Sequence, residues 1–234
     1  MIRKSGVNPQ LWSGIILGIS VYILSTLIAF GILPVKMFLV LVPAFILIMI
    51  LELFRLQDKP FDSLAHTIFP VLYTALPFSM FPFSAFGRSD IETLIRHEVL
   101  AFSPGIVIGF FFLIWANDSG AYLAGASFGR HKLFERISPK KTWEGFFGGF
   151  LLALIVSWFL SGWLGVIGKF EWAIVSVIIS IAGTFGDLLE SMLKRSLDVK
   201  DSGSILPGHG GFLDRFDSTL ISFPLVYLFI LLFG

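Results

Sequence analysis

Long apolar runs alternate with short polar stretches along the whole chain, and this pattern predicts membrane-spanning helices. About 20 consecutive apolar residues are enough for a helix to cross a bilayer. Seven stretches meet this requirement, roughly residues 11–33, 37–54, 64–83, 104–125, 145–167, 171–193 and 216–233. The third is the least regular, because Pro70, Pro77 and Pro82 interrupt it.

The expected fold class is therefore all-α, a polytopic transmembrane helical bundle of about seven spans. Residues 84–103 form a polar connection, in which residues 91–100 are expected to make a short surface helix. No repeat or linker is evident, so residues 1–234 are expected to form one integral membrane domain. Residues 1–103 carry its N-terminal spans and residues 104–234 the remaining four.

Composition supports this interpretation and excludes several functions. Apolar residues make up 56% of the 234 positions, charged residues only 14%, and the mean hydropathy is +0.87. A net charge of +1 argues against a nucleic-acid partner, and the absence of cysteine excludes disulfides and thiolate chemistry. The first apolar run is too long for a cleaved signal peptide.

Most of the seventeen Lys and Arg residues lie in segments on one side of the predicted bilayer. The positive-inside rule places that side in the cytoplasm, together with the N-terminus. The two richest polar segments, 126–144 and 194–215, then face the compartment that holds nucleotides.

Most acidic residues lie in loops or at the ends of spans, but two stand apart, Asp118 in LIWANDSGAYLAG and Asp187 in IAGTFGDLLESMLK, each toward the cytoplasmic end of an apolar span. A charge at the centre of a span costs about 2.5–3.5 kcal/mol on insertion scales, so such residues usually mark a pathway or a site. The structural alternative is a carboxylate that reaches the interface or pairs with a neighbouring helix.

The spacing around Asp187 favours a functional site. Asp187, Glu190, Ser191 and Lys194 share one helix face, and Asp214 and Asp217 are three residues apart. Two helices can thus bring three carboxylates, Asp187, Asp214 and Asp217, to one place. Oxygen ligands of this kind suit Mg²⁺ or another hard cation.

Basic and glycine-rich segments beside these carboxylates are suited to phosphate binding. Glycine leaves backbone N–H groups free to face an anion. The predicted binding residues are Lys194, Arg195, Lys200, Gly208, His209, Gly210, Gly211 and Arg215. Lys140 and Lys141 precede Trp143, which would hold their loop at headgroup depth, so we also expect them to contact a nucleotide or lipid phosphate.

Several motifs resemble those of the phosphatidate cytidylyltransferases, also called CDP-diacylglycerol synthases. They are WANDSGAY (115–122), GRHK (129–132), SPKKTWEG (138–145), SMLKR (191–195), VKDSG (199–203), LPGHGG (206–211) and LDRFDS (213–218). The resemblance covers residues 104–234, and its fixed charged positions make it specific. Residues 1–103 match only in being hydrophobic, and members of that family usually have a longer N-terminal half.

The resemblance implies transfer of a cytidylyl group from CTP to phosphatidic acid, for phospholipid biosynthesis. It implies Mg²⁺, with a second cation such as K⁺ in some members, and a homodimer as one assembly. It also implies an integral protein of the bacterial inner membrane, in contact with membrane lipids, with its active site facing the cytoplasm.

The same resemblance implies roles for individual residues. Asp187 and Asp214 would bind metal with Asp217 adjacent, and Lys194 and Lys200 would join Asp187 and Asp214 as catalytic residues. The residues that would bind substrate are Asp118, Lys140, Lys141, Ser191, Arg195, Asp201, Gly208, His209, Gly210, Gly211 and Arg215.

Two other functions remain open at this point. A CTP-dependent lipid kinase, acting on a polyprenol or phytol, would transfer the γ-phosphoryl group to an alcohol. A cation-coupled transporter would use Asp118 and Asp187 as a relay, but it predicts inverted repeats that the sequence lacks.

Overall fold

The structure is a computed structural model, which describes residues 7–86, 102–197, 199, 202–203 and 211–233. Within these residues, seven helices are long and apolar enough to cross a membrane. The expected all-α class and the seven spans are confirmed, and the chain is an integral membrane protein. Two compact units make up the chain, Met1–Phe102 and Ser103–Gly234.

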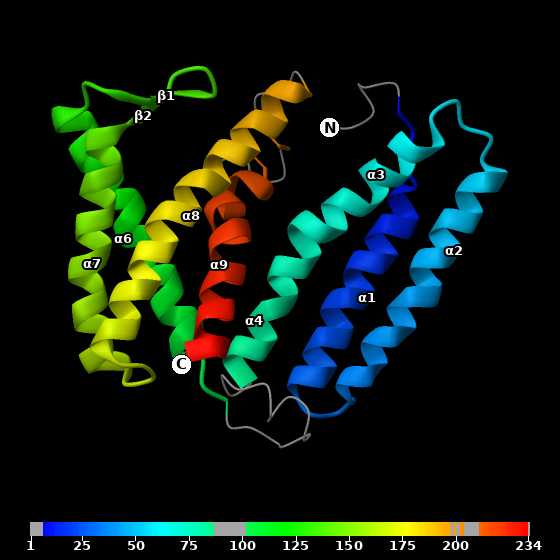
Figure 1. The fold of residues 1–234 in the computed structure, drawn as a ribbon, viewed down its shortest axis with the longest axis horizontal. Coiled ribbons are helices and arrows are strands. Elements are labelled where there is room, and N and C mark those ends of the chain that lie inside the picture. Colours follow the sequence, from blue (N-terminus) through cyan, green and yellow to red (C-terminus); the bar gives the residue numbers. More distant parts are fainter. Residues whose placement is uncertain (1–6, 87–101, 198, 200–201, 204–210, 234) are drawn as a thin grey trace. The chain divides into compact units, whose positions relative to one another are not determined.

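The first unit contains three of the spans (Figure 1). Its elements are α1 (Leu11–Ala29), the 3₁₀ helix η2 (Val35–Val40), α2 (Leu41–Phe54), α3 (Pro60–Pro70), the π-helical η3 (Val71–Ala75) and α4 (Leu76–Phe86). Leu17, Ile48 and Val71 form a buried core between α1, α2 and η3. The first span ends earlier than expected, at Ala29, because Gly31 adopts a left-handed conformation with φ of +73°.

The prolines do not break the third span, which runs from Pro60 to Phe86. Between Pro70 and Pro77 the helix widens into the π-helical segment η3. The Thr74 hydroxyl donates a hydrogen bond to the Pro70 carbonyl at 2.6 Å. The polypeptide thus accommodates both prolines by local changes in helical hydrogen bonding, as transmembrane helices commonly do.

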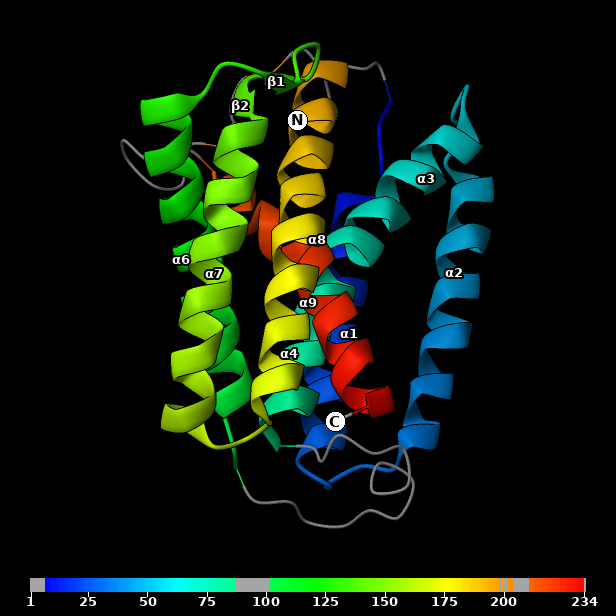
Figure 2. The same ribbon diagram turned by 60° about the vertical axis from the view of Figure 1, so that its left-hand side comes forward.

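The second unit contains the other four spans, together with a β-hairpin (Figures 1 and 2). Its elements are α6 (Gly105–Phe128), β1 (Lys132–Phe134), β2 (Ser138–Thr142), α7 (Trp143–Leu164), α8 (Lys169–Ser196) and α9 (Leu213–Phe233). Trp172, Phe110 and Phe223 are fully buried in its core. The aromatic rings of Phe110 and Phe223 meet edge to face, which joins α6 to α9.

Small residues allow α6 and α7 to approach closely. A Cβ atom on Gly120 would lie 2.6 Å from the Gly148 carbonyl oxygen, and one on Gly149 would lie 2.5 Å from the Asn117 carbonyl oxygen. A Cβ atom on Gly148 would collide with the side chain of Ala124. Close backbone contact through glycine and alanine is a usual way for membrane helices to associate.

The antiparallel hairpin of β1 and β2 is a correction to the expected loop before α7. Lys132 pairs with Thr142, and Phe134 pairs with Ser138. Thr142 then caps α7, because its hydroxyl accepts a hydrogen bond from the Gly145 N–H at 3.2 Å. The surface helix expected at residues 91–100 lies outside the described residues.

Candidate functional site

One end of the second unit brings together its chemically active side chains. The β1–β2 hairpin lies at this end of the unit (Figure 1). Helix α8 ends there, and α9 begins near the same end. A cavity of about 340 Å³ opens between α6, the hairpin, α7, α8 and α9. Its lining includes Asp118, Lys140, Lys141, Thr184 and Asp187.

The regular geometry of α8 places the predicted functional residues on one face. Ser191 donates a hydrogen bond to Asp187 Oδ1 at 3.3 Å, and Lys194 Nζ lies 2.6 Å from Glu190 Oε2. Gly186 then lets α9 come close to this face, because a Cβ atom there would lie 2.5 Å from the Asp217 carbonyl oxygen. Helix periodicity and one glycine thus bring Asp217 beside the acidic residues of α8.

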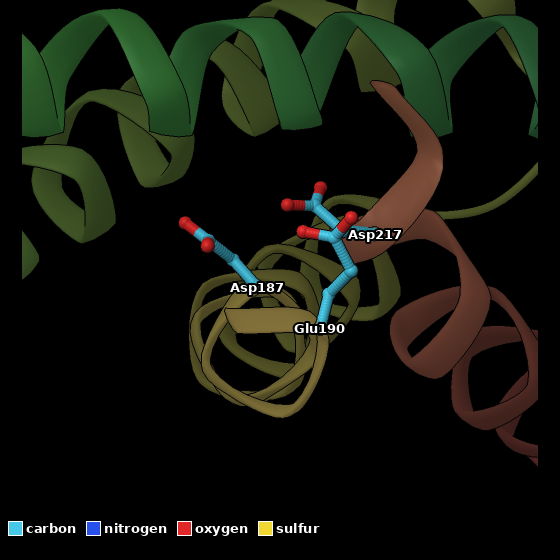
Figure 3. Close-up of side chains that lie close together, drawn as sticks. All are labelled: Asp187, Glu190 and Asp217. Carbon is cyan, nitrogen blue, oxygen red and sulfur yellow. The ribbon is translucent and has the colours of Figure 1, made fainter. Parts of the chain in front are cut away.

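Asp187, Glu190 and Asp217 form the carboxylate cluster. One oxygen of each lies within 4.8 Å of an oxygen of the other two. Figure 3 shows Asp187 and Glu190 extending from α8, and Asp217 reaching them from α9. Glu190 is completely buried, whereas Asp187 and Asp217 are partly exposed.

The cluster fits a divalent cation on the chemistry of its oxygens. Among the described residues, neither carboxylate oxygen of Glu190 has a hydrogen-bond partner, although both are buried. Lys194 approaches Oε2 as an ion pair at 2.6 Å, but outside hydrogen-bonding geometry. Buried carboxylate oxygens without hydrogen bonds are costly unless a cation satisfies them. The three carboxylates could therefore hold Mg²⁺, which accepts a few protein oxygens and leaves its other positions to water and phosphate.

Lys194 on α8 and Lys141 on β2 neutralise part of this negative charge. Lys141 on β2 forms an ion pair with Asp187 Oδ2 at 2.6 Å and donates to the Thr184 carbonyl at 3.4 Å. Lys140, its neighbour on β2, is exposed and lines the same cavity. Lys141 thus lies beside the acidic site, on a strand instead of the expected loop, and its contact with a nucleotide or lipid phosphate stays a prediction.

Asp214 lies outside the carboxylate cluster, although the sequence predicted it as a metal ligand. Its Oδ1 accepts a hydrogen bond from Lys194 at 2.7 Å. Its Oδ2 accepts from the Ser202 N–H at 2.9 Å, the Ser202 hydroxyl at 2.6 Å and the Gly211 N–H at 2.8 Å. Both carboxylate oxygens of Asp214 are thus engaged in hydrogen bonds that hold the connection between α8 and α9. Metal binding by Asp214 stays a prediction.

The other predicted residues are distributed as follows. Asp118 on α6 lines the cavity. Arg195, near the end of α8, donates to the Ile137 carbonyl at 2.6 Å and so ties this helix to the hairpin. Arg215 is exposed in the first turn of α9. Outside the described residues lie Lys200, Asp201, Gly208, His209 and Gly210.

The sequence-based prediction of the cluster missed Glu190 as a member. Its position three residues after Asp187 placed it on the correct helix face. The packing of α9 against α8, which brings Asp217 into the cluster and pairs Asp214 with Lys194 and Ser202, depends on tertiary structure. The sequence spacing did not contain this information.

Several known proteins are similar in sequence to about half of the chain. Relatives named phosphatidate cytidylyltransferase occur in Bacillus subtilis, 48% identical over 123 residues, and in Staphylococcus epidermidis, 44% identical over 122 residues. A third, from Staphylococcus aureus, is 46% identical over 127 residues. Each match covers 52% of this chain and 46–47% of the relative.

The chain thus spans about half the length of the curated relatives it matches. A family model described as the cytidylyltransferase family matches a much larger part, residues 1–233. With this match over nearly the whole sequence, the chain belongs to the cytidylyltransferase family.

Proposed function

We propose that this protein transfers the cytidylyl group of CTP to phosphatidic acid. A phosphate oxygen of the lipid attacks the α-phosphorus of CTP and forms a new P–O bond. The bond from the α-phosphorus to the oxygen that bridges it to the β-phosphorus breaks, and pyrophosphate leaves. The products are CDP-diacylglycerol and pyrophosphate.

The observation that carries this proposal is the carboxylate cluster beside two lysines, in a chain 44–48% identical over half its length to proteins named phosphatidate cytidylyltransferase. Both substrates are anionic, and phosphatidate already carries a nucleophilic oxyanion at neutral pH. The chemical difficulty is the approach of two anions and the departure of pyrophosphate. A bound cation and nearby ammonium groups would reduce the repulsion between the two anions and stabilise the departing pyrophosphate.

The residues divide into two groups by charge. Asp187, Glu190 and Asp217 would hold Mg²⁺, which when bound supplies positive charge to the transferred and departing phosphates. Lys140 and Lys141 face the cavity and would bind phosphate oxygens as point charges. Gly208, His209, Gly210 and Gly211 keep their predicted role in substrate binding, and a second cation such as K⁺ stays a prediction from the resemblance.

The cavity lies near the ends of apolar helices, where a lipid substrate and a water-soluble substrate can meet. The acyl tails of phosphatidate stay in hydrocarbon, while its headgroup reaches water-soluble CTP. Since the positive-inside rule puts this end in the cytoplasm, we place the site on the cytoplasmic face of the bacterial inner membrane. The homodimer implied by the resemblance also stays a prediction.

The test is a transfer assay with purified protein, Mg²⁺, phosphatidic acid and CTP labelled in either the α or the γ phosphate. We expect the α label in lipid and the γ label in pyrophosphate. Asp187→Asn should remove the transfer, and Glu135→Gln, which neutralises an exposed carboxylate in the hairpin turn, should retain it.

The same assay separates the alternatives. If the γ label appears in lipid when a polyprenol or phytol replaces phosphatidic acid, the protein is a lipid kinase and the proposal is wrong. If no label enters lipid under either condition, the cytidylyl transfer is also contradicted.

A further inference from the structure

Two lysines serve as counter-ions of the carboxylate cluster, and they differ in how firmly they are held. Lys194 contacts two carboxylates, Glu190 Oε2 at 2.6 Å and Asp214 Oδ1 at 2.7 Å. Lys141 contacts a single carboxylate, Asp187 Oδ2 at 2.6 Å. Both lysines are partly exposed, with 18% and 25% of their side-chain surface accessible.

Lys141 is therefore the counter-ion that can leave. Release of Lys194 would break two ion pairs, with Glu190 and with Asp214. It would also leave Asp214, which holds the connection between α8 and α9, without its positively charged partner. Release of Lys141 would break one ion pair and a long hydrogen bond to the Thr184 carbonyl at 3.4 Å. The Lys141 side chain already lines the cavity, so it needs only a short movement to meet a ligand there.

A divalent cation in the carboxylate cluster would compete with this ammonium group. Mg²⁺ binds carboxylate oxygens at about 2.0–2.1 Å, and the ammonium of Lys141 already contacts the Asp187 carboxylate at 2.6 Å. Two cations beside the same carboxylate repel each other. The arrangement therefore makes the ammonium of Lys141 and a divalent cation competitors for the Asp187 carboxylate.

We propose that Lys141 is an exchangeable counter-ion that couples cation binding to phosphate binding. A divalent cation displaces the ammonium from Asp187, and the freed ammonium binds a phosphate of the nucleotide in the cavity. Because thermodynamic coupling is reciprocal, phosphate that draws Lys141 away also increases the affinity of the cluster for the cation. This inference rests on the proposed function, since it needs a cation and a nucleotide at the same site.

The first test measures cation affinity without nucleotide. Purified wild-type protein, Lys141→Met and Lys140→Met are titrated with Mn²⁺ alone, and binding is followed by electron paramagnetic resonance. Lys141→Met should bind Mn²⁺ about tenfold more tightly than wild type, a typical coupling magnitude, because the competing ammonium is gone. Lys140→Met removes the same charge from the adjacent residue, which has no ion pair among the described residues, and should change the affinity much less.

The second test uses wild-type protein and does not depend on the folding of a variant. An amine-acetylating reagent is applied with and without Mg²⁺, and acetylation of each lysine is measured by mass spectrometry. Mg²⁺ should increase acetylation of Lys141 several-fold, and CTP added with Mg²⁺ should reverse the increase. Acetylation of Lys194 should stay constant, because its pair with Asp214 is retained.

The outcomes distinguish this inference from the proposed function. If wild type binds Mn²⁺ but Lys141→Met and Lys140→Met behave alike, or if Mg²⁺ leaves Lys141 acetylation unchanged, the exchange is overturned while the transfer function stands. If wild type and Asp187→Asn both fail to bind Mn²⁺, the proposed cation site and the exchange both fail. The assay with labelled CTP then decides separately whether cytidylyl transfer occurs.

Discussion

Glu190 is the residue whose environment most directly indicates a cation. Its carboxylate is fully buried, and its Oε1 has no hydrogen-bond partner among the described residues. Lys194 compensates part of its charge from the side of Oε2. Burial of a carboxylate is tolerated when other charges or a metal ion complete its interactions. Asp187 and Asp217 lie close enough to Glu190 to bind a metal ion together with it.

Replacement of Glu190 by Gln should weaken cation binding while keeping the shape of the side chain. We expect Mn²⁺ affinity and cytidylyl transfer to fall by about 10–100-fold, as for other changes around metal sites. The measurements are Mn²⁺ titration and turnover, with Glu135→Gln in the exposed hairpin turn as the matched control. Wild-type Mn²⁺ affinity in Glu190→Gln would remove this residue from the cation site.

Asp214 should show the opposite balance between stability and cation binding. Asp214→Ala removes the partner of Lys194, Ser202 and Gly211 at once. Removal of one partner from a fully buried ion pair costs roughly 3–5 kcal/mol, and the partial exposure of Asp214 makes the expected loss smaller.

The measurement is the midpoint of thermal unfolding in detergent, compared with Mn²⁺ affinity in the same sample. The midpoint should fall clearly, and Mn²⁺ affinity measured well below it should change less than in Glu190→Gln. An unchanged midpoint together with lost Mn²⁺ binding would instead support the predicted role of Asp214 as a metal ligand.

At the scale of elements, the contact of α6 with α7 depends on the absence of side chains at particular glycines. Gly148→Ala would place a methyl group against Ala124, so we expect a loss of about 1–3 kcal/mol, the usual cost of overpacking. Gly162 lies on the same helix α7, and a methyl group there would meet nothing within 4 Å among the described residues. Gly162→Ala should therefore be neutral or stabilising by up to about 1 kcal/mol through helix propensity.

Thermal unfolding of both variants in detergent measures this difference. Equal midpoints for Gly148→Ala and Gly162→Ala would mean that α6 and α7 can separate without cost. Because Lys141 directly precedes Thr142, the cap of α7, a shift of α7 in Gly148→Ala should also lower cytidylyl transfer.

A second element-scale feature is a polar network that joins α1, α2 and α3 in the first unit. Glu52, with 2% of its side chain exposed, accepts hydrogen bonds from Gln10 at 2.6 Å and Arg55 at 2.9 Å. Arg55 also donates to Ser63 at 3.1 Å and to the Asn8 carbonyl at 2.7 Å. The network fixes the turn between α2 and α3 to the start of α1.

Arg55→Met should destabilise the protein by leaving the Glu52 carboxylate buried without its cation. Loss of one partner of a buried pair costs about 3–5 kcal/mol, whereas replacement of both partners by neutral groups costs less. The double variant Arg55→Met with Glu52→Gln should therefore unfold at a higher temperature than Arg55→Met alone. If the two changes simply add, the pair is not coupled and the network does not stabilise the unit in this way.

At the scale of the whole molecule, the spans were predictable because hydropathy and length alone determine which helices can cross a bilayer. Helix periodicity correctly placed Asp187 and Glu190 on one face of α8, although the prediction did not include Glu190 among the ligands. The hairpin at residues 132–142 was not predictable, since its short strands show no alternation of apolar and polar residues. The sequence predicted both Asp214 and Asp217 as ligands, and the position of Asp214 outside the carboxylate cluster was not predictable, because it depends on how α9 packs against Gly186.

The orientation of the whole chain in the membrane can be tested directly, because the sequence contains no cysteine that would react in the background. Glu135→Cys introduces a thiol in the hairpin turn, at the end that carries the cavity, and Lys169→Cys introduces one at the opposite end of α8. A membrane-impermeant maleimide applied to intact spheroplasts should label Lys169→Cys and should label Glu135→Cys only after the membrane is permeabilised. This asymmetry follows from the excess of Lys and Arg on the hairpin side of the predicted bilayer. Labelling of Glu135→Cys in intact spheroplasts would put the cavity on the outer face, away from cytoplasmic CTP, and a cytidylyltransferase could not work in that orientation.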